Sequence, residues 1–143
     1  MLSNSAKYAL KAVLFLALHT DGNKKMMVKD IYASINVPQS YLAKLLQQLS
    51  KHDVISSSRG PKGGFYLSPA NLEQPLIKIV DVIDGEQRFR TCMLSLRECD
   101  SERPCVLHDL VGNASTYFIK NLEGTTIKEI IVDVKTGKSI LPL

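Results

Sequence analysis

The chain has 143 residues, of which 45% are hydrophobic and 22% charged. This is the composition of an ordinary globular domain, and the length suffices to bury a core without disulfides or metals. No apolar run approaches the roughly 18 residues of a transmembrane helix. The few Gly and Pro residues exclude collagen-like and low-complexity classes.

Charge is divided unevenly along the chain. Residues 1–72 carry a net charge of +6, whereas residues 73–143 carry −2. A basic half joined to a slightly acidic half suggests a module that binds a polyanion, followed by one that does not. A merely solvated basic surface is the alternative.

Residues 4–19 predict the first helix. Its apolar run follows Lys7 and Lys11, as in a signal peptide, but no small-residue cleavage site comes after it. An N-cap at Ser3 or Asn4 fits an amphipathic helix instead. We therefore expect a cytoplasmic protein, in which cysteines stay reduced.

Two helices follow over residues 29–35 and 38–51, and Pro38 suits the first position of the second one. In that helix an apolar face and a polar face lie opposite each other. The apolar face consists of Leu42, Leu45, Leu46 and Leu49. The polar face consists of Ser40, Lys44, Gln47 and Lys51. Most solvated faces mix both signs of charge, so the absence of acids on this one favours contact with DNA.

Residues 54–58 and 65–67 predict two strands, joined by a basic, glycine-rich loop. Helix, short turn, helix and a hairpin with a basic tip make a winged helix-turn-helix. Its third helix would enter the major groove, and its tip would meet the backbone or minor groove. The loop glycines, which allow positive φ and close approach to phosphates, are Gly60, Gly63 and Gly64. A nucleotide-binding loop is the weaker alternative, because its glycine spacing is absent and a strand follows.

The second half begins with a helix over residues 75–84, ended by Gly85. Residues 86–104 show neither helix nor strand pattern, and a loop of this length is usually functional or disordered. A long helix is predicted over residues 105–122.

Thr125 or Thr126 caps a final short helix that runs to residue 134, and the tail from Lys135 is expected to be mobile. The predicted fold class is mainly α with a small β-hairpin wing: a winged helix-turn-helix over residues 1–72, which we expect to bind DNA, followed by residues 73–143 with a long C-terminal helix.

The three cysteines lie within 14 positions, in and just after the loop predicted over residues 86–104. With the following histidine they form C-x6-C-x5-C-x2-H: Cys92, Cys99, Cys105 and His108. Thiolates are the usual ligands of iron–sulfur clusters, and imidazole can replace one of them. Cys105 and His108, three positions apart in a helix, would share one face. Such a set is hard to explain by packing.

Zinc is the chemical rival, since Cys3His is a standard structural zinc site. Zinc sites usually contain C-x2–4-C pairs, which are absent here, so the spacing favours an iron–sulfur cluster. A disulfide would leave one cysteine over and needs an oxidising compartment. A DNA-binding regulator with a structural zinc or a thiol redox switch therefore stays as the alternative. No nucleophile–base or paired-carboxylate constellation predicts an enzyme.

The sequence resembles the IscR/NsrR family of bacterial winged-helix regulators over nearly its whole length. The segments that carry the resemblance are Lys7-Tyr8-Ala9-Leu10, Ser40-Tyr41-Leu42 with Leu45, Arg59-Gly60-Pro61-Lys62-Gly63-Gly64-Phe65, Val82-Ile83-Asp84-Gly85 and the three cysteines. The resemblance implies a homodimer built on the long helices, one cluster per subunit, and control of transcription through an inverted repeat in double-stranded DNA. We therefore assign DNA binding to residues 1–72, and cluster binding and dimerisation to residues 73–143, with the long C-terminal helix as the dimerisation helix.

The C-x2-H ending resembles the branch that holds a [2Fe-2S] cluster on three Cys and one His. The [4Fe-4S] branch can take an Asp from the partner's first helix, and the first helix here has no acid. The x6 spacing is one longer than the x5 of the His-ligated branch, so a [4Fe-4S] cluster stays open as a second possibility. Should His108 not be the fourth ligand, the candidates are Glu98, Asp100 and Glu102.

By resemblance, Ser40, Tyr41 and Lys44 contact DNA from the third helix, and Arg59 contacts it from the wing. Arg59 suits a narrow minor groove, while Lys51 and Lys62 suit phosphates. Gln39 and Gly63 complete the predicted DNA-binding set.

Overall fold

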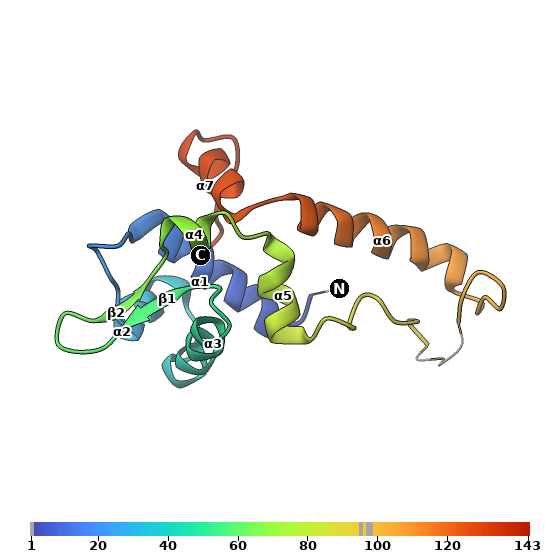
Figure 1. Ribbon diagram of the computed structural model, residues 1–143, viewed down its shortest axis with the longest axis horizontal. Coiled ribbons are helices and arrows are strands. Elements are labelled where there is room, and N and C mark those ends of the chain that lie inside the picture. Colours follow the sequence, from blue (N-terminus) through green and yellow to red (C-terminus); the bar gives the residue numbers. More distant parts are fainter. Residues whose placement is uncertain (1, 95, 97–98) are drawn as a thin grey trace.

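The computed structural model describes residues 2–94, 96 and 99–143 (Figure 1). The helices and strands are α1 (Asn4–His19), α2 (Val28–Ile35), α3 (Gln39–Lys51), β1 (Ser56–Ser58), β2 (Gly64–Tyr66), α4 (Pro69–Leu72), α5 (Leu76–Asp84), α6 (His108–Gly124) and α7 (Ile127–Lys135). Residues 2–84 and 125–143 form a compact body, called the head below. Residues 85–124 extend from it as an arm, made of the cysteine loop and α6 (Figure 1). The mainly helical winged-helix prediction is therefore confirmed.

The core of the head is built around α1. The Oγ of Ser3 caps this helix by accepting the Ala6 N–H at 3.0 Å, which confirms the predicted start. The side chains that are fully buried around α1 come from every part of the head and include Leu16, Ile31, Leu46, Ile79 and Ile127. All four leucines of the predicted apolar face of α3 are buried as well.

The hairpin is shorter than predicted, because its strands pair only where Ser57 stands opposite Phe65 and at the two flanking pairs. Val54 and Ile55, expected in the first strand, are buried in the core just before it. A third segment supports the hairpin: Met26 and Phe65 exchange backbone hydrogen bonds of 2.9 and 2.8 Å. This contact holds the base of the wing against the segment before α2.

α5 and α7 are held side by side where each begins. The N–H of Leu76 donates to the Thr125 carbonyl at 2.9 Å, and the N–H of Ile127 donates to the Gln74 carbonyl at 3.0 Å. Both helices pack their apolar faces on α1, so the core continues across residue 72. The division into residues 1–72 and 73–143 stays a prediction about function.

Three further corrections concern a helix that was not predicted, the bounds of the long helix, and the C-terminal tail. α4 was not predicted, although Ser68 and Asn71 cap it reciprocally. The long helix starts at His108, not at 105, and ends at Gly124. The tail after Lys135 is not free, because Leu141 packs against the core. In the described part of the chain no helix is both long and apolar enough to span a membrane.

Candidate nucleic-acid interface and metal centre

The polar face of α3 lies open to solvent. The side chains exposed along it are Gln39, Ser40, Lys44, Gln47 and Lys51. Pro38 was expected to be the first residue of this helix, but it is the N-cap. Its carbonyl accepts the Leu42 N–H at 2.9 Å. The face combines cationic and hydrogen-bonding groups, as a helix that reads a major groove requires.

Tyr41 lies at the edge of that face and turns toward α1. Its hydroxyl is hydrogen-bonded to the Ser5 hydroxyl, and its ring meets the Tyr8 ring edge-on at a centroid distance of 6.2 Å. Tyr41 therefore braces α3 against α1, and its hydroxyl already has a partner inside the protein.

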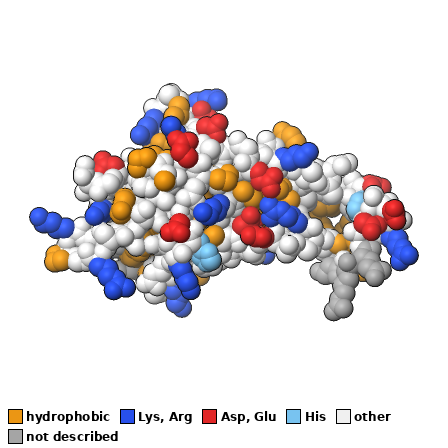
Figure 2. Space-filling model, viewed as in Figure 1, with side chains coloured by type: hydrophobic (Ala, Val, Ile, Leu, Met, Phe, Trp, Pro, Cys, Tyr) orange, Lys and Arg blue, Asp and Glu red, His pale blue; other side chains and the backbone are white. Residues whose placement is uncertain are grey.

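The wing carries Arg59 and Lys62 at its exposed tip. Lys and Arg side chains project from this end of the head without neighbouring acids, at the lower left of Figure 2. Gly60 and Gly64 have φ of 102° and 144°, which confirms the expected positive φ at these two positions.

The expectation for Gly63 needs correction. It is not among the positive-φ glycines, and it is buried beneath the backbone of Ser58 and Arg59, where a Cβ would collide. Its N–H donates to the Gly60 carbonyl at 2.9 Å and is thereby occupied. Gly63 shapes the tip of the wing and offers no N–H to a phosphate.

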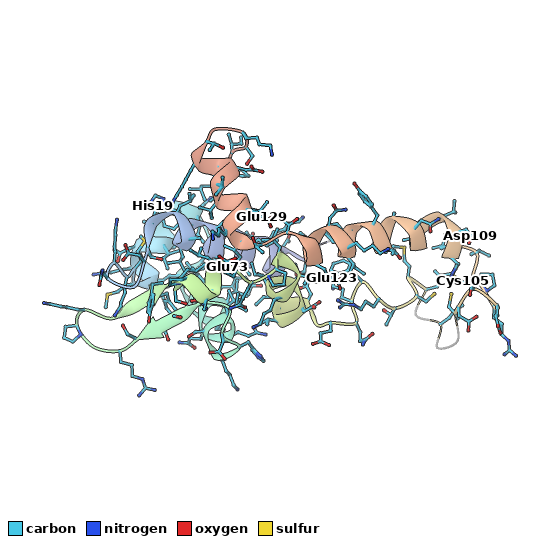
Figure 3. The ribbon with its side chains drawn as sticks, turned by 45° about the horizontal axis from the view of Figure 1, so that its top comes forward. His19, Glu73, Cys105, Asp109, Glu123 and Glu129 are labelled. Atoms are coloured by element: carbon cyan, nitrogen blue, oxygen red, sulfur yellow. The ribbon has the colours of Figure 1, made fainter. Side chains whose placement is uncertain are left out.

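At the other end of the molecule the arm brings the cysteine sulfurs together (Figure 3). The Sγ atoms of Cys92, Cys99 and Cys105 all lie within 4.8 Å of one another. Cys92 and Cys105 are 3.5 Å apart, and Cys99 Sγ lies 3.3 Å from Nδ1 of His108. All four side chains are half-buried. The four donors therefore converge in two close pairs.

The pairing differs from the one expected from helical spacing. Cys105 lies in the turn before α6, and His108 is the first residue of the helix, its N–H bonded to the Cys105 carbonyl at 3.0 Å. The two residues therefore do not share a helical face, and the sulfur that the imidazole contacts through Nδ1 is that of Cys99.

The surroundings of Cys92 and Cys99 give their thiols different pKa values. The backbone N–H of Leu96 lowers the pKa of Cys92 to about 7, because it stabilises the thiolate. For Cys99 the backbone N–H of Cys105 acts in the same direction, but burial and the neighbouring thiols outweigh it and raise the pKa.

Three sulfurs and one imidazole are a soft donor set that suits an iron–sulfur cluster or zinc. Metal–sulfur bonds of about 2.3 Å give a tetrahedron with edges of about 3.8 Å, close to the 3.5 Å between Cys92 and Cys105. The residues therefore fit a metal centre. Of the acidic alternatives, Glu98 lies outside the described residues, and Asp100 accepts the N–H groups of Glu102 and Arg103.

The sequence reasoning missed the residues that anchor the arm. Arg90 bridges α5 and α6, at 3.3 Å from Asp81 and 3.0 Å from Glu123. Phe89 meets Phe118 of α6 edge-on at a centroid distance of 5.5 Å. A cavity of about 830 Å³ lies between this part of the loop, the cysteines and α6. Nothing in the spacing of Arg90 signals a bridge to residue 123, which lies 33 positions away.

Comparison with known proteins finds regulators of transcription and structures with the same fold. NsrR of Geobacillus kaustophilus, an HTH-type transcriptional regulator, is 27% identical over 141 residues, which cover 98% of this chain and 95% of that protein. The structure of T. potens IscR superposes with a TM-score of 0.72 at 22% identity, covering 97% and 91% of the two chains. The structure of CymR, the global cysteine regulator of B. subtilis, gives 0.72 at 21% identity over 92% and 96%.

These relatives are regulators of transcription and not enzymes. Residues 2–133 match the family described as "Iron-dependent Transcriptional regulator". On this evidence the chain belongs to the Rrf2 family of transcriptional regulators.

Proposed function

We propose that this regulator senses iron–sulfur or redox status through a cluster held by Cys92, Cys99, Cys105 and His108. The observation that supports this most strongly is the convergence of four soft donors in two pairs at the end of the arm. When bound, a cluster connects the four donor residues, and redox reactions or competing ligands can alter this connection.

A [2Fe-2S] cluster suits the donors best, because it takes two protein ligands at each of two irons. Cys92 with Cys105, and Cys99 with His108, provide two such pairs. A neutral imidazole leaves the site less negative than a fourth thiolate would, which raises the reduction potential. A [4Fe-4S] cluster is the second form to be tested.

DNA contact is proposed through α3 and the wing. Gln39, Ser40 and Lys44 would face the groove, and Lys51 a phosphate. Arg59 would enter the minor groove, and Lys62 would contact the DNA backbone beside it. Tyr41 supports these contacts by bracing α3 against α1. The edge of its ring is proposed to contact the DNA as well.

A second copy of the chain is proposed to cover α6. No residue of this helix is buried in the single chain. Leu110 and Tyr117 are 75 and 73% exposed, and they lie along one stripe with Ala114. Val106, which is 85% exposed, lies in the turn before the helix. Two such stripes packed around a two-fold axis would place the α3 helices on half-sites about 34–36 Å apart.

Purification without air tests the cluster. We expect a brown or red protein with visible absorption and equimolar iron and sulfide, whose cluster becomes labile in His108→Ala. His108→Cys should keep the cluster and lower its potential. If His108→Ala keeps the native spectrum, stability and potential, the fourth ligand is another residue, and Asp100 and Glu102 are tested next.

A Cys3His zinc site is the second candidate, favoured by the closeness of all three sulfurs, which suits a single ion. A colourless protein that contains one zinc per chain after purification without air would establish it in place of the cluster.

A further inference from the structure

α5 lies between the arm and the DNA-reading helix (Figure 1). Its last turn contacts the arm through the carboxylates of Asp81 and Asp84, and it contacts α3 through the carbonyl of Val82. These three residues are neighbours in sequence, so they move together when the last turn of α5 moves.

On the arm side, two arginines tie the first residues of the cysteine loop to this turn. Arg88 Nε lies 3.4 Å from Asp84, whose side chain is only 4% exposed and also accepts the N–H and hydroxyl of Ser3. Arg90 contacts Asp81 and Glu123, and it donates to the Glu86 carbonyl at 2.6 Å.

Arg90 is two residues from Cys92, the first of the sulfur donors. Two residues span at most about 7 Å of chain, so a displacement of Cys92 is passed to the backbone that carries the Arg90 guanidinium. A change at the metal centre therefore acts on Asp81 through one side chain.

On the head side, Val82 presents a carbonyl without a helical partner, because it lies in the last turn of α5. Gln48 of α3 supplies the missing donor: its Nε2 donates to this carbonyl at 2.7 Å. Gln48 thus fixes α3 to α5, while its neighbour Gln47 is exposed on the DNA-reading face.

We infer that α5 relays the state of the cysteine loop to the DNA-reading helix, with Arg90 and Gln48 as the positioning residues at its two contacts. This inference rests on the proposed function. A shift of the loop displaces the last turn of α5 through Arg90, and Gln48 carries the displacement to α3. Neither residue is one of the four donors or one of the proposed DNA contacts, although Gln48 is exposed on α3.

The test compares the affinity for operator DNA of cluster-loaded and metal-free protein, measured for the wild type and for variants. Couplings between two sites commonly amount to about 5- to 150-fold, and we expect a wild-type ratio in that range. Arg90→Gln and Gln48→Ala should each bring the ratio at least about threefold closer to one, as expected for loss of an ion pair or hydrogen bond. Arg90→Lys, which keeps the charge, should retain part of the ratio.

Two matched controls accompany these variants. Gln47→Ala should weaken DNA binding in both states by the same factor and keep the ratio. Lys128→Gln removes the 2.7 Å ion pair with Glu73, which joins two segments of the head, and should also keep the ratio. The double variant of Arg90 and Gln48 should lower the ratio no further than the more damaging single change, because both lie on one path.

The visible spectrum and iron content of Arg90→Gln should equal those of the wild type. If both variants keep the full wild-type ratio, the relay through α5 is refuted while the proposed function stands. If the wild type itself binds DNA equally in both states, the proposed sensing function fails, and the relay fails with it.

Discussion

The head and the arm are built on different sources of stability. In the head, α1 alone buries seven residues, among them Val13 and Leu16, which are inaccessible to solvent. α6 is one residue longer than α1 and buries none. The head is thus held by its own core, whereas the arm presents an exposed apolar stripe and four converging donors, for which we propose a second copy of the chain and a cluster.

Among the described residues, the arm is positioned by ion pairs such as Arg90–Glu123, by the ring pair Phe89–Phe118 and by Leu122, which packs against the core of the head. Exposed ion pairs such as Arg90–Glu123 contribute about 0.2–1 kcal/mol each. Such contacts orient a segment without locking it, which suits a region that has to respond to a signal.

The largest expected effect comes from the core of the head. Leu46→Ala removes a fully buried side chain of α3 and should lower the free energy of unfolding by about 2–5 kcal/mol. The comparison change Thr116→Ala, on exposed α6 and outside the proposed apolar stripe, should lower it by less than about 1 kcal/mol. Urea denaturation at one protein concentration measures both. Equal losses would contradict the contrast between head and arm.

The next effect concerns association of the arm with a second copy. Leu110→Asp places a charge in the proposed apolar stripe and forfeits roughly 1.5–3 kcal/mol of burial, which should weaken the dimer by tenfold or more. Sedimentation at micromolar concentration measures this. Thr116→Asp, about 120° around the helix, is the control and should leave the dimer intact. A monomeric wild type would refute the dimer.

The wing should show a smaller effect, confined to the head. Arg59→Ala should weaken operator binding by about 1–3 kcal/mol with the fold intact. Lys62→Ala should weaken binding to all sequences alike and reduce the salt dependence by about one unit. Titrations at several salt concentrations separate the two. If neither variant changes affinity, the wing does not belong to the interface.

The smallest effect separates two thiols of the arm. In metal-free protein Cys92, with a pKa of about 7, is half ionised at neutral pH, whereas the pKa of Cys99 is raised. Cys92 should therefore react with iodoacetamide up to about tenfold faster, since lower intrinsic nucleophilicity offsets part of its larger thiolate fraction. Its rate should rise with pH to half its maximum near pH 7. Mass spectrometry of the alkylated peptides measures this, and equal rates would contradict the assignment.

Local patterns in the sequence were enough to predict most of the head. The four leucines of α3 were assigned to the core from their spacing alone, because a helix places positions three and four apart on one face. Ser3 and Gly85 mark helix ends for equally local reasons. The donor set of Cys92, Cys99, Cys105 and His108 was also recognisable, because the chemistry of a ligand depends on its residue type.

Contacts between distant segments could not be read in this way. The start of α6 at His108 depends on how the cysteine loop returns to the helix, and that start turns the imidazole to Cys99 instead of Cys105. Gly63 was expected to approach a phosphate because it lies in a glycine-rich loop, but it is packed under the backbone of Ser58. The bridges from Arg90 to Glu123 and from Gln48 to Val82 span 33 and 34 positions. Periodicity constrains only neighbours along the chain, whereas these pairs form because α5 packs against both α3 and α6 and brings their partners within reach.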